Sequence, residues 1–148
     1  MACCVYHSPI GPLYLESSGG ALTKLSFSGP ERQDADPVLQ YACGWLDRYF
    51  QGARERFALP LAPTGTGFQK AVWAAMGAIP YGQTSTYGAL AAALGKPGSA
   101  RAVGGACNRN PIAIIQPCHR VVGASGLTGY AGGLEKKRLL LELEQNEK

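Results

Sequence analysis

The chain has 148 residues, of which 46% are hydrophobic and 16% charged, without repeats or low-complexity tracts, which excludes a disordered protein. No stretch approaches the roughly 18 apolar residues of a membrane-spanning helix, and no basic segment followed by an apolar one opens the chain, so we expect a cytoplasmic protein. The net charge is +4, yet residues 56–134 contain no Asp or Glu, so this stretch would attract a polyanion.

Residues 1–63 are predicted to form a small α+β unit. Three short apolar runs, at 3–7, 12–16 and 21–27, are separated by Gly, Pro and Ser, a pattern typical of an antiparallel meander. A helix is expected to follow, because residues 37–50 carry one apolar stripe of Val38, Tyr41, Trp45, Leu46 and Tyr49. Residues 51–67 are rich in Pro, Gly and Thr, which indicates a linker.

From residue 68 onward the pattern is mostly helical. Residues 68–79 carry apolar side chains at helical spacing and end at Ile-Pro-Tyr-Gly. Two short helices, 86–94 and 99–108, are joined by Gly-Lys-Pro-Gly, with Ser99 as the N-cap of the second. This arrangement predicts a helix-turn-helix, although any two packed helices give a similar pattern. The fold class expected is α+β, a three-stranded antiparallel sheet with a helix followed by a mostly helical domain with a helix-turn-helix.

The second helix of this pair has two features that bear on DNA binding. Gly104 and Gly105 each cost about 1 kcal/mol relative to alanine inside a helix. Their presence indicates a close backbone approach, either by another helix or by a phosphate backbone. Arg101 lies near the amino terminus of the helix, where backbone N–H groups also favour anions. The alternative for Arg101 is a solvated surface arginine.

Residues 114–122, IIQPCHRVV, place a cysteine directly beside a histidine. Residues 112–115 are expected to form a short buried strand, but Cys118 and His119 could not cooperate on a strand, because neighbouring strand residues point to opposite faces. A partnership therefore requires residues 117–120 to form a turn. His119 and the basic surroundings are expected to lower the pKa of Cys118 and so favour the nucleophilic thiolate. The alternative is an inert buried cysteine.

The last predicted helix, over residues 134–148, carries a carboxylate near its apolar side. The side chains expected to face the core are Leu140, Leu141 and Leu143. Glu144 lies three and four residues after two of these leucines, at the edge of the stripe, so it needs a polar partner, for which a histidine ring N–H is suited. A nucleophile, a base and an orienting carboxylate would then be supplied by Cys118, His119 and Glu144.

Several motifs in matching order make the chain similar to one known family. The segments FQKAVWAAMGAIPYGQTSTYGALAAALG, ARAVGGACNRNP, PCHRVV and GLTGYAGGLEKKRLLLELE resemble those of the O6-alkylguanine-DNA alkyltransferases, the methylated-DNA–protein-cysteine methyltransferases. The resemblance runs from residue 68 nearly to the end, and more loosely across the amino-terminal meander. It implies a ribonuclease-H-like small domain over 1–63 and a DNA-binding, alkyl-acceptor domain over 64–148.

The resemblance also implies an activity. The protein would flip O6-alkylguanine out of duplex DNA through the minor groove and transfer the alkyl group irreversibly to Cys118, one turnover per molecule. O4-alkylthymine is implied as a further substrate. The implied partner is double-stranded DNA containing O6-alkylguanine, bound by a monomer without a cofactor. Some relatives bind zinc through amino-terminal residues, but Cys3, Cys4 and His7 do not reproduce that ligand set, so no metal is expected.

Chemical roles follow from the same resemblance, motif by motif. Cys118 is implied as the alkyl acceptor, with His119 acting through a bound water and Glu144 orienting the histidine. Asn110 is implied to support the active-site turn. Tyr87 is implied to assist departure of the guanine.

Contacts with DNA are implied as well. Arg101 would fill the space that the flipped base vacates. The other implied DNA contacts are Thr86, Ala100, Ala102 and Gly104. The implied walls of the base pocket are Val121, Tyr130 and Ala131, and many relatives have serine at the last of these positions.

Two other functions stay open on the sequence alone. A cysteine hydrolase would normally bring its histidine from a distant segment, would need an oxyanion site, and would leave the acid-free stretch unexplained. A non-catalytic binder of alkylated DNA is the second alternative. Whether Cys118 gains an alkyl group from DNA distinguishes this binder from a transferase.

Overall fold

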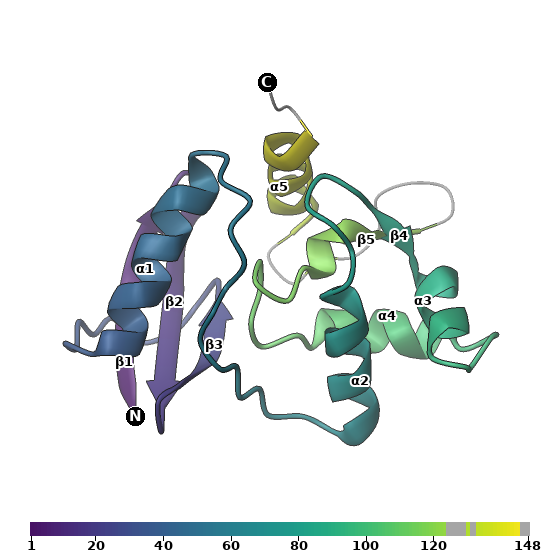
Figure 1. Ribbon diagram of the computed structural model, residues 1–148, viewed down its shortest axis with the longest axis horizontal. Helices are drawn as coiled ribbons and strands as arrows, with labels where there is room; N and C mark the ends of the chain where they lie inside the picture. The colour runs from purple at the N-terminus through teal and green to yellow at the C-terminus, as the bar shows by residue number, and fades with distance from the viewer. Residues whose placement is uncertain (124–129, 131–132, 146–148) are drawn as a thin grey trace. The chain divides into compact units, whose positions relative to one another are not determined.

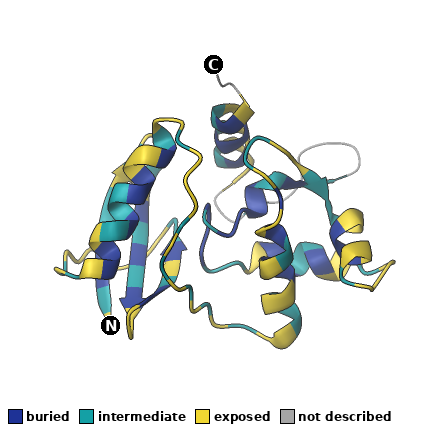
Figure 2. Ribbon diagram, viewed as in Figure 1, coloured by how far each residue is buried: buried dark blue, intermediate teal, exposed yellow. Residues whose placement is uncertain are grey.

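The computed structural model describes residues 1–123, 130 and 133–145 and forms two compact units, Met1–Thr64 and Gly65–Lys148 (Figure 1). Within each unit the buried positions lie on the inner faces of the helices and strands, and the outer helix faces are exposed (Figure 2). No helix in the described part of the chain is long and apolar enough to cross a membrane. The predicted α+β class is confirmed.

The first unit is a three-stranded antiparallel meander with one helix packed on it. The strands, in sheet order, are β1 (Ala2–Ser8), β2 (Gly11–Ser18) and β3 (Ala21–Ser26). Helix α1 (Pro37–Phe50) spans the residues that its apolar stripe predicts, and its first free N–H groups are capped by the Asp36 side chain. Leu13 and Leu15 alternate along β2 and are buried beneath the helix, as a sheet with one covered face requires.

The segment after α1 belongs partly to this unit. Leu22 of β3 donates its N–H to Pro60 O at 3.0 Å and accepts from Ala62 N at 2.8 Å. Residues 60–62 therefore pair with an edge of the sheet before the chain enters the second unit, and they occupy backbone groups that an open edge strand would expose. Part of the predicted linker, residues 60–62 of 51–67, therefore belongs to the sheet of the first unit.

The second unit is mostly helical, as predicted. Its helices are α2 (Gly67–Met76), α3 (Tyr87–Ala93), α4 (Ala100–Asn108) and α5 (Leu134–Gln145), with a 3-10 turn η1 (Cys118–Arg120) between the last two. Two short strands, β4 (Ser85–Thr86) and β5 (Val121–Val122), pair in parallel. These strands were not predicted, because two residues are too few to show an alternating pattern.

Helices α3 and α4 form the predicted helix-turn-helix. Residues 94–99 join them, and Gly95 and Gly98 have φ values of 74° and 93°, a left-handed backbone that favours glycine. Ser99 occupies the N-cap position of α4, but the predicted capping hydrogen bond is absent from the described structure. The backbone at Ser99, with φ −96° and ψ 22°, is not in the extended conformation that a capping side chain needs.

Candidate active site

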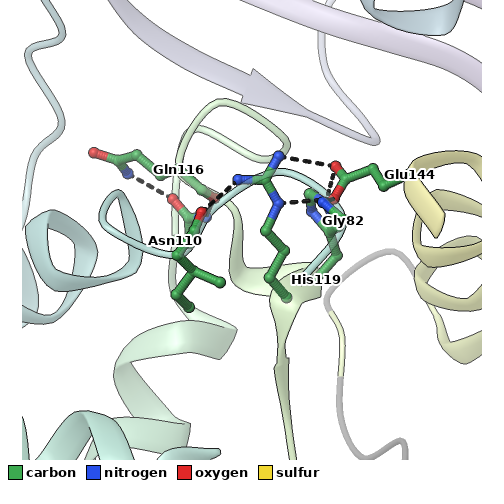
Figure 3. Close-up of polar contacts among 7 residues, drawn as sticks. Gly82, Asn110, Gln116, His119 and Glu144 are labelled. Atoms are coloured by element: carbon green, nitrogen blue, oxygen red, sulfur yellow. Dashed lines mark hydrogen bonds and ion pairs between the residues drawn. The ribbon is translucent and has the colours of Figure 1, made fainter. Parts of the chain in front are cut away.

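A single side chain, Asn110, organises the turn that precedes Cys118. Its Oδ1 accepts hydrogen bonds from Ile112 N at 3.0 Å and Gln116 Nε2 at 2.7 Å. Its Nδ2 donates to Gln116 O at 2.7 Å and to Cys118 Sγ at 3.2 Å. Figure 3 shows the Gln116 amide directed at Asn110. One amide therefore fixes both ends of the turn and contacts the thiol directly.

The strand predicted over residues 112–115 is wrong. Ile114 has a φ of 71°, and Ile115 N donates to Ala113 O at 2.8 Å, which closes a three-residue γ-turn around Ile114. A β-branched residue in this region is strained by about 1–3 kcal/mol. The contacts of Asn110 and the burial of Ile112 and Ile114 hold this conformation, which no strand pattern could predict.

Cys118 and His119 lie in a turn, as their cooperation requires. Cys118 N donates to Gln116 O at 2.8 Å across Pro117, whose φ of −83° and ψ of 67° form an inverse γ-turn. The 3-10 turn η1 then carries both side chains, and the chain enters β5 immediately afterwards. Both side chains are buried.

His119 contacts the carboxylate predicted for it. His119 Nε2 lies 2.6 Å from Glu144 Oε2, and both side chains are fully buried (Figure 3). Arg120 also binds Glu144, with Nε 2.8 Å from Oε1 and Nη2 3.0 Å from Oε2, and its Nη1 donates to Ile79 O at 2.9 Å. Gly82 N lies 3.4 Å from Glu144 Oε1. Glu144 thus holds the histidine and the neighbouring arginine at once.

This arrangement fixes the protonation pattern of His119. Glu144 accepts from the Arg120 guanidinium and is a carboxylate, which can only accept, so Nε2 of His119 carries the hydrogen between them. Burial lowers the pKa of His119 below its ordinary value of 6.5, and Glu144 opposes that shift. The ring is therefore neutral near pH 7. Its Nδ1 has no hydrogen-bond partner among the described residues and is the nitrogen that can accept a proton.

The expected thiolate is not the resting form of Cys118. Burial raises the pKa of the thiol above its ordinary value of 9.0 and outweighs the groups that lower it. Those groups are, in order of size, the Asn110 amide, the Lys137 ammonium, a backbone N–H and the Tyr130 hydroxyl. The prediction of a lowered pKa is thus wrong for the protein without DNA, because it left out the cost of a buried charge.

Lys137 is a site residue that sequence reasoning missed. It is fully buried on α5, and its Nζ lies 3.5 Å from Tyr87 Oη and 5.8 Å from the centre of that ring. Burial lowers the pKa of Lys137, while Cys118 and Cys107 raise it. Its spacing contained the signal, because Lys137 precedes Leu140 by three residues and Glu144 by seven, on the same helix face.

The predicted DNA-contacting residues lie on α4, except Thr86, which ends β4 and is the N-cap of α3. Arg101 and Ala102 are exposed, while Ala100 and Gly104 are half-buried. Arg101 makes no hydrogen bond or ion pair within the described residues. Thr86 is half-buried and its hydroxyl caps α3 by accepting from Ala89 N at 3.0 Å, which is a structural role in itself.

The two glycines of α4 are not explained by close packing against a described neighbour. A Cβ at Gly104 would lie 3.8 Å from the Tyr87 ring, and one at Gly105 would lie 3.9 Å from Arg109 Nη1. Both distances are ordinary van der Waals contacts, so alanine would fit at either position. Of the two reasons considered for these glycines, close approach of another helix is therefore disfavoured.

The residues predicted to line the base pocket differ in how far they are exposed. Val121 is fully buried in the core of the second unit, so its side chain faces no open surface in this structure. Tyr130 is half-buried, and burial, with smaller contributions from Cys118 and Glu144, raises the pKa of its hydroxyl. Ala131 lies outside the described residues. No group of three His, Cys, Asp or Glu side chains in the described ranges is placed to hold a metal ion.

Comparison with protein families gives two matches that together span most of the chain. Residues 1–63 match the model of the 6-O-methylguanine DNA methyltransferase, ribonuclease-like domain. Residues 67–146 match the model of the 6-O-methylguanine DNA methyltransferase, DNA binding domain.

Individual proteins are similar over nearly the full length. A methylated-DNA–protein-cysteine methyltransferase of Methanosarcina barkeri is 48% identical over 151 aligned positions, which cover 96% of each protein. The crystal structure of the Mycobacterium tuberculosis O6-methylguanine methyltransferase is 47% identical with a TM-score of 0.88, covering 97% of this chain and 92% of that one. Mycobacterium tuberculosis OGT in complex with DNA gives the same TM-score at 48% identity, with the same coverage.

Proposed function

Because the chain belongs to the 6-O-methylguanine DNA methyltransferase family and is a DNA-repair enzyme that transfers an alkyl group to a protein cysteine, we propose that Cys118 is the acceptor and O6-alkylguanine in duplex DNA the donor. The observation that carries this proposal is the placement of Cys118 in a rigid turn beside the buried His119–Glu144 pair.

Comparison with the other cysteine of the second unit supports the choice of Cys118. Cys107 lies on α4 in the core, where its Sγ is 3.7 Å from Met76 Sδ. Burial raises the pKa of Cys107 to about 12. Within the described residues, no hydrogen bond joins Cys107 Sγ to a histidine or an amide, whereas the Asn110 amide donates to Cys118 Sγ at 3.2 Å. Cys107 is therefore a packing residue.

The first chemical step is proton removal from the Cys118 thiol. His119 Nδ1 takes that proton through one water, as a general base with a pKa below its ordinary value. Glu144, already bound to Nε2–H, stabilises the imidazolium that forms. Burial keeps the Cys118 thiol protonated in the resting protein. The thiolate and the imidazolium therefore form only when substrate is present.

The second step is displacement at the alkyl carbon. The Cys118 thiolate forms a sulfur–carbon bond while the bond from that carbon to guanine O6 breaks, and the electron pair leaves with the guanine. The departing base takes a proton, for which the Tyr87 hydroxyl is the donor. Tyr87 Oη accepts a hydrogen bond from Lys137 Nζ, and a hydroxyl that accepts from a cation is a stronger donor itself. The thioether has no carbonyl for water to attack, so each molecule acts once.

Engagement of DNA is assigned to α3 and α4. The acid-free stretch attracts the phosphate backbone, and α4 enters the minor groove with its small residues Ala100, Ala102 and Gly104 against the DNA. The target nucleotide is flipped out, and Arg101, exposed near the start of α4, fills the gap in the stack. The protein acts on DNA as a monomer, and its second unit carries the chemistry. O4-alkylthymine in DNA is a further substrate.

The mass of the intact protein tests this proposal. After mixing with a duplex that contains O6-methylguanine, the protein is expected to gain one methyl group, located by trypsin on the peptide of residues 110–120. Cys107→Ala is the matched control and should still gain it. Cys118→Ala should bind the duplex and gain nothing. Binding without any methyl gain in the parent protein would identify it as a non-catalytic binder of alkylated DNA.

A further inference from the structure

The first unit contains a second pair of reactive groups that the alkyl transfer does not use. Cys4 of β1 and Cys43 of α1 lie 39 positions apart in sequence, yet their Sγ atoms are 3.8 Å apart. Cys4 is buried, and Cys43 is half-buried on the helix that covers the sheet. Both cysteines are free thiols.

We propose that Cys4 and Cys43 form a dithiol that hydrogen peroxide converts reversibly into a disulfide, as a modification site separate from Cys118. The sulfur atoms are already in contact, so forming the bond needs a small side-chain movement and no change of fold. Two thiols placed together across a helix and a strand are also a geometry that packing alone does not require, since either would fit as an isolated buried cysteine.

The electrostatics of the pair distinguish the two thiols. The two sulfur atoms share a contact in which either thiol can be the donor, and this contact lowers the pKa of Cys43 despite its partial burial and the nearby Asp47. The same contact, with burial, raises the pKa of Cys4, and Asp34 and Asp36 add to that rise. Cys43 is therefore the thiol that ionises first, and it is also the one that solvent reaches.

The reaction balances with peroxide as the oxidant. The Cys43 thiolate attacks one peroxide oxygen, the oxygen–oxygen bond breaks, and a sulfenic acid forms as hydroxide leaves. The Cys4 sulfur then attacks the sulfenic sulfur, the sulfur–oxygen bond breaks, and the second hydroxide leaves. The hydroxides take up the two thiol protons as water. Both cysteines are oxidised together by two electrons, and one peroxide is reduced to two waters.

Cys3 provides a matched control within the same strand. It neighbours Cys4 in β1 and is as deeply buried, but successive strand residues point to opposite faces of the sheet. Its backbone N–H donates to the Asp34 carboxylate at 2.9 Å. Cys3 is therefore expected to take no part in the disulfide.

Peptide mapping of the full chain tests the proposal. Hydrogen peroxide is added to the folded protein, free thiols are blocked with iodoacetamide, and trypsin is used without reduction. The cysteines then fall on four peptides, residues 1–24, 33–48, 102–109 and 110–120. The expected product joins 1–24 to 33–48 with the loss of two hydrogen atoms, runs as a monomer on a non-reducing gel, and disappears with dithiothreitol.

Variants assign the bond. The joined peptide should persist in Cys3→Ser and be absent from Cys4→Ala and Cys43→Ser. Cys43→Ser should keep the methyl gain on Cys118, because the pair is separate from the transfer site. The oxidised parent should also unfold at a higher temperature than the reduced one, since the bond closes a long loop. Persistence of the joined peptide in Cys4→Ala would overturn the proposal. So would complete blocking of Cys43 by iodoacetamide in protein whose Cys118 the peroxide has already oxidised.

Discussion

Arg120 and Glu144 form a two-pronged ion pair, with Nε–Oε1 and Nη2–Oε2 distances of 2.8 and 3.0 Å, on the carboxylate that holds His119. Arg120 is 12% exposed at its side chain and Glu144 is fully buried, so water screens this pair little. The planar guanidinium fixes the carboxylate in one orientation, and the carboxylate fixes the ring of the base.

Arg120→Lys is therefore expected to slow alkyl transfer while leaving most of the fold intact. Lysine keeps the positive charge but loses the two parallel hydrogen bonds and the bond to Ile79 O, so Glu144 and the His119 ring lose their fixed orientation. Misplacement of a catalytic group costs about 10- to 100-fold in rate. The single-turnover rate of methyl transfer measures the effect. An unchanged rate with an altered unfolding temperature would show that the pair serves stability alone.

The pH dependence of transfer should follow His119 in the parent protein and Cys118 in a variant that lacks the histidine. His119 acts as a base only when neutral, and its pKa lies below 6.5, so the parent rate should be flat from about pH 6.5 upward and fall only under more acidic conditions. Without the base, the reaction depends on spontaneous ionisation of a thiol whose pKa lies above 9.0. His119→Ala should therefore show a rate that rises about tenfold per pH unit across the neutral range.

Stability should respond to His119 as well. The folded protein holds this side chain neutral with a pKa below its unfolded value of 6.5, so the unfolded state binds more protons in acid. Its contribution to the free energy of unfolding is present above pH 6.5 and is lost as the pH falls below that value. Thermal unfolding of the parent and of His119→Ala over this range provides the comparison, and equal pH slopes would contradict a buried neutral histidine.

Asn110→Asp separates the two functions of the amide. Aspartate keeps the acceptor for Ile112 N and Gln116 Nε2 but loses the N–H groups that reach Gln116 O and Cys118 Sγ. Gln116 O would keep the bond from Cys118 N but lose the one from Asn110, and the loss of a hydrogen bond costs about 0.5–1.5 kcal/mol of unfolding free energy. The added negative charge also disfavours the Cys118 thiolate, so transfer should slow more than in Asn110→Ala. Urea unfolding and the single-turnover rate measure the two effects, and a faster transfer in the aspartate variant would refute the role assigned to the amide.

The sequence predicted helices better than it predicted the site. The apolar stripe over 37–50 matched α1, because a helix pattern of that length is unambiguous. The contact of Glu144 with His119 was also predictable, since the edge of an apolar stripe is where a buried carboxylate needs a partner.

What the sequence could not predict depended on contacts between distant residues. Four apolar residues before Gln116 suggested a strand, but the Asn110 side chain turns them into a γ-turn with Ile114 in the left-handed region. The pKa of Cys118 required knowing how deeply the packing of the unit buries it. Lys137 was not singled out from the sequence, because a lysine is almost never fully buried and its spacing alone does not identify the exception.

Arg101→Ala should lower transfer more than it lowers DNA affinity. Removing one cation weakens binding to any duplex and reduces the salt dependence by about one phosphate contact. If Arg101 fills the stack, the variant additionally loses the flipped state, so the methyl-transfer rate falls further than affinity for unmodified duplex. Lys96→Ala, which removes an exposed cation from the turn before α4, is the matched control and should reduce affinity and rate together. Equal transfer rates for Arg101→Ala and the parent would refute the assignment.

Gly104→Ala tests whether DNA is what keeps α4 free of side chains. In the protein alone the added methyl group would lie 3.8 Å from the Tyr87 ring, so it fits, and alanine inside a helix is favoured over glycine by about 1 kcal/mol. The variant is therefore expected to unfold at a higher temperature than the parent. A close phosphate or sugar would instead collide with the methyl group, so affinity for duplex DNA and the transfer rate at low DNA concentration should both fall. Ala102→Ser, which adds one small atom at an exposed position of the same helix, measures how strictly the surface limits size. A more stable Gly104→Ala that binds DNA as tightly as the parent would mean that the glycine has another reason, and that α4 does not approach the backbone at this point.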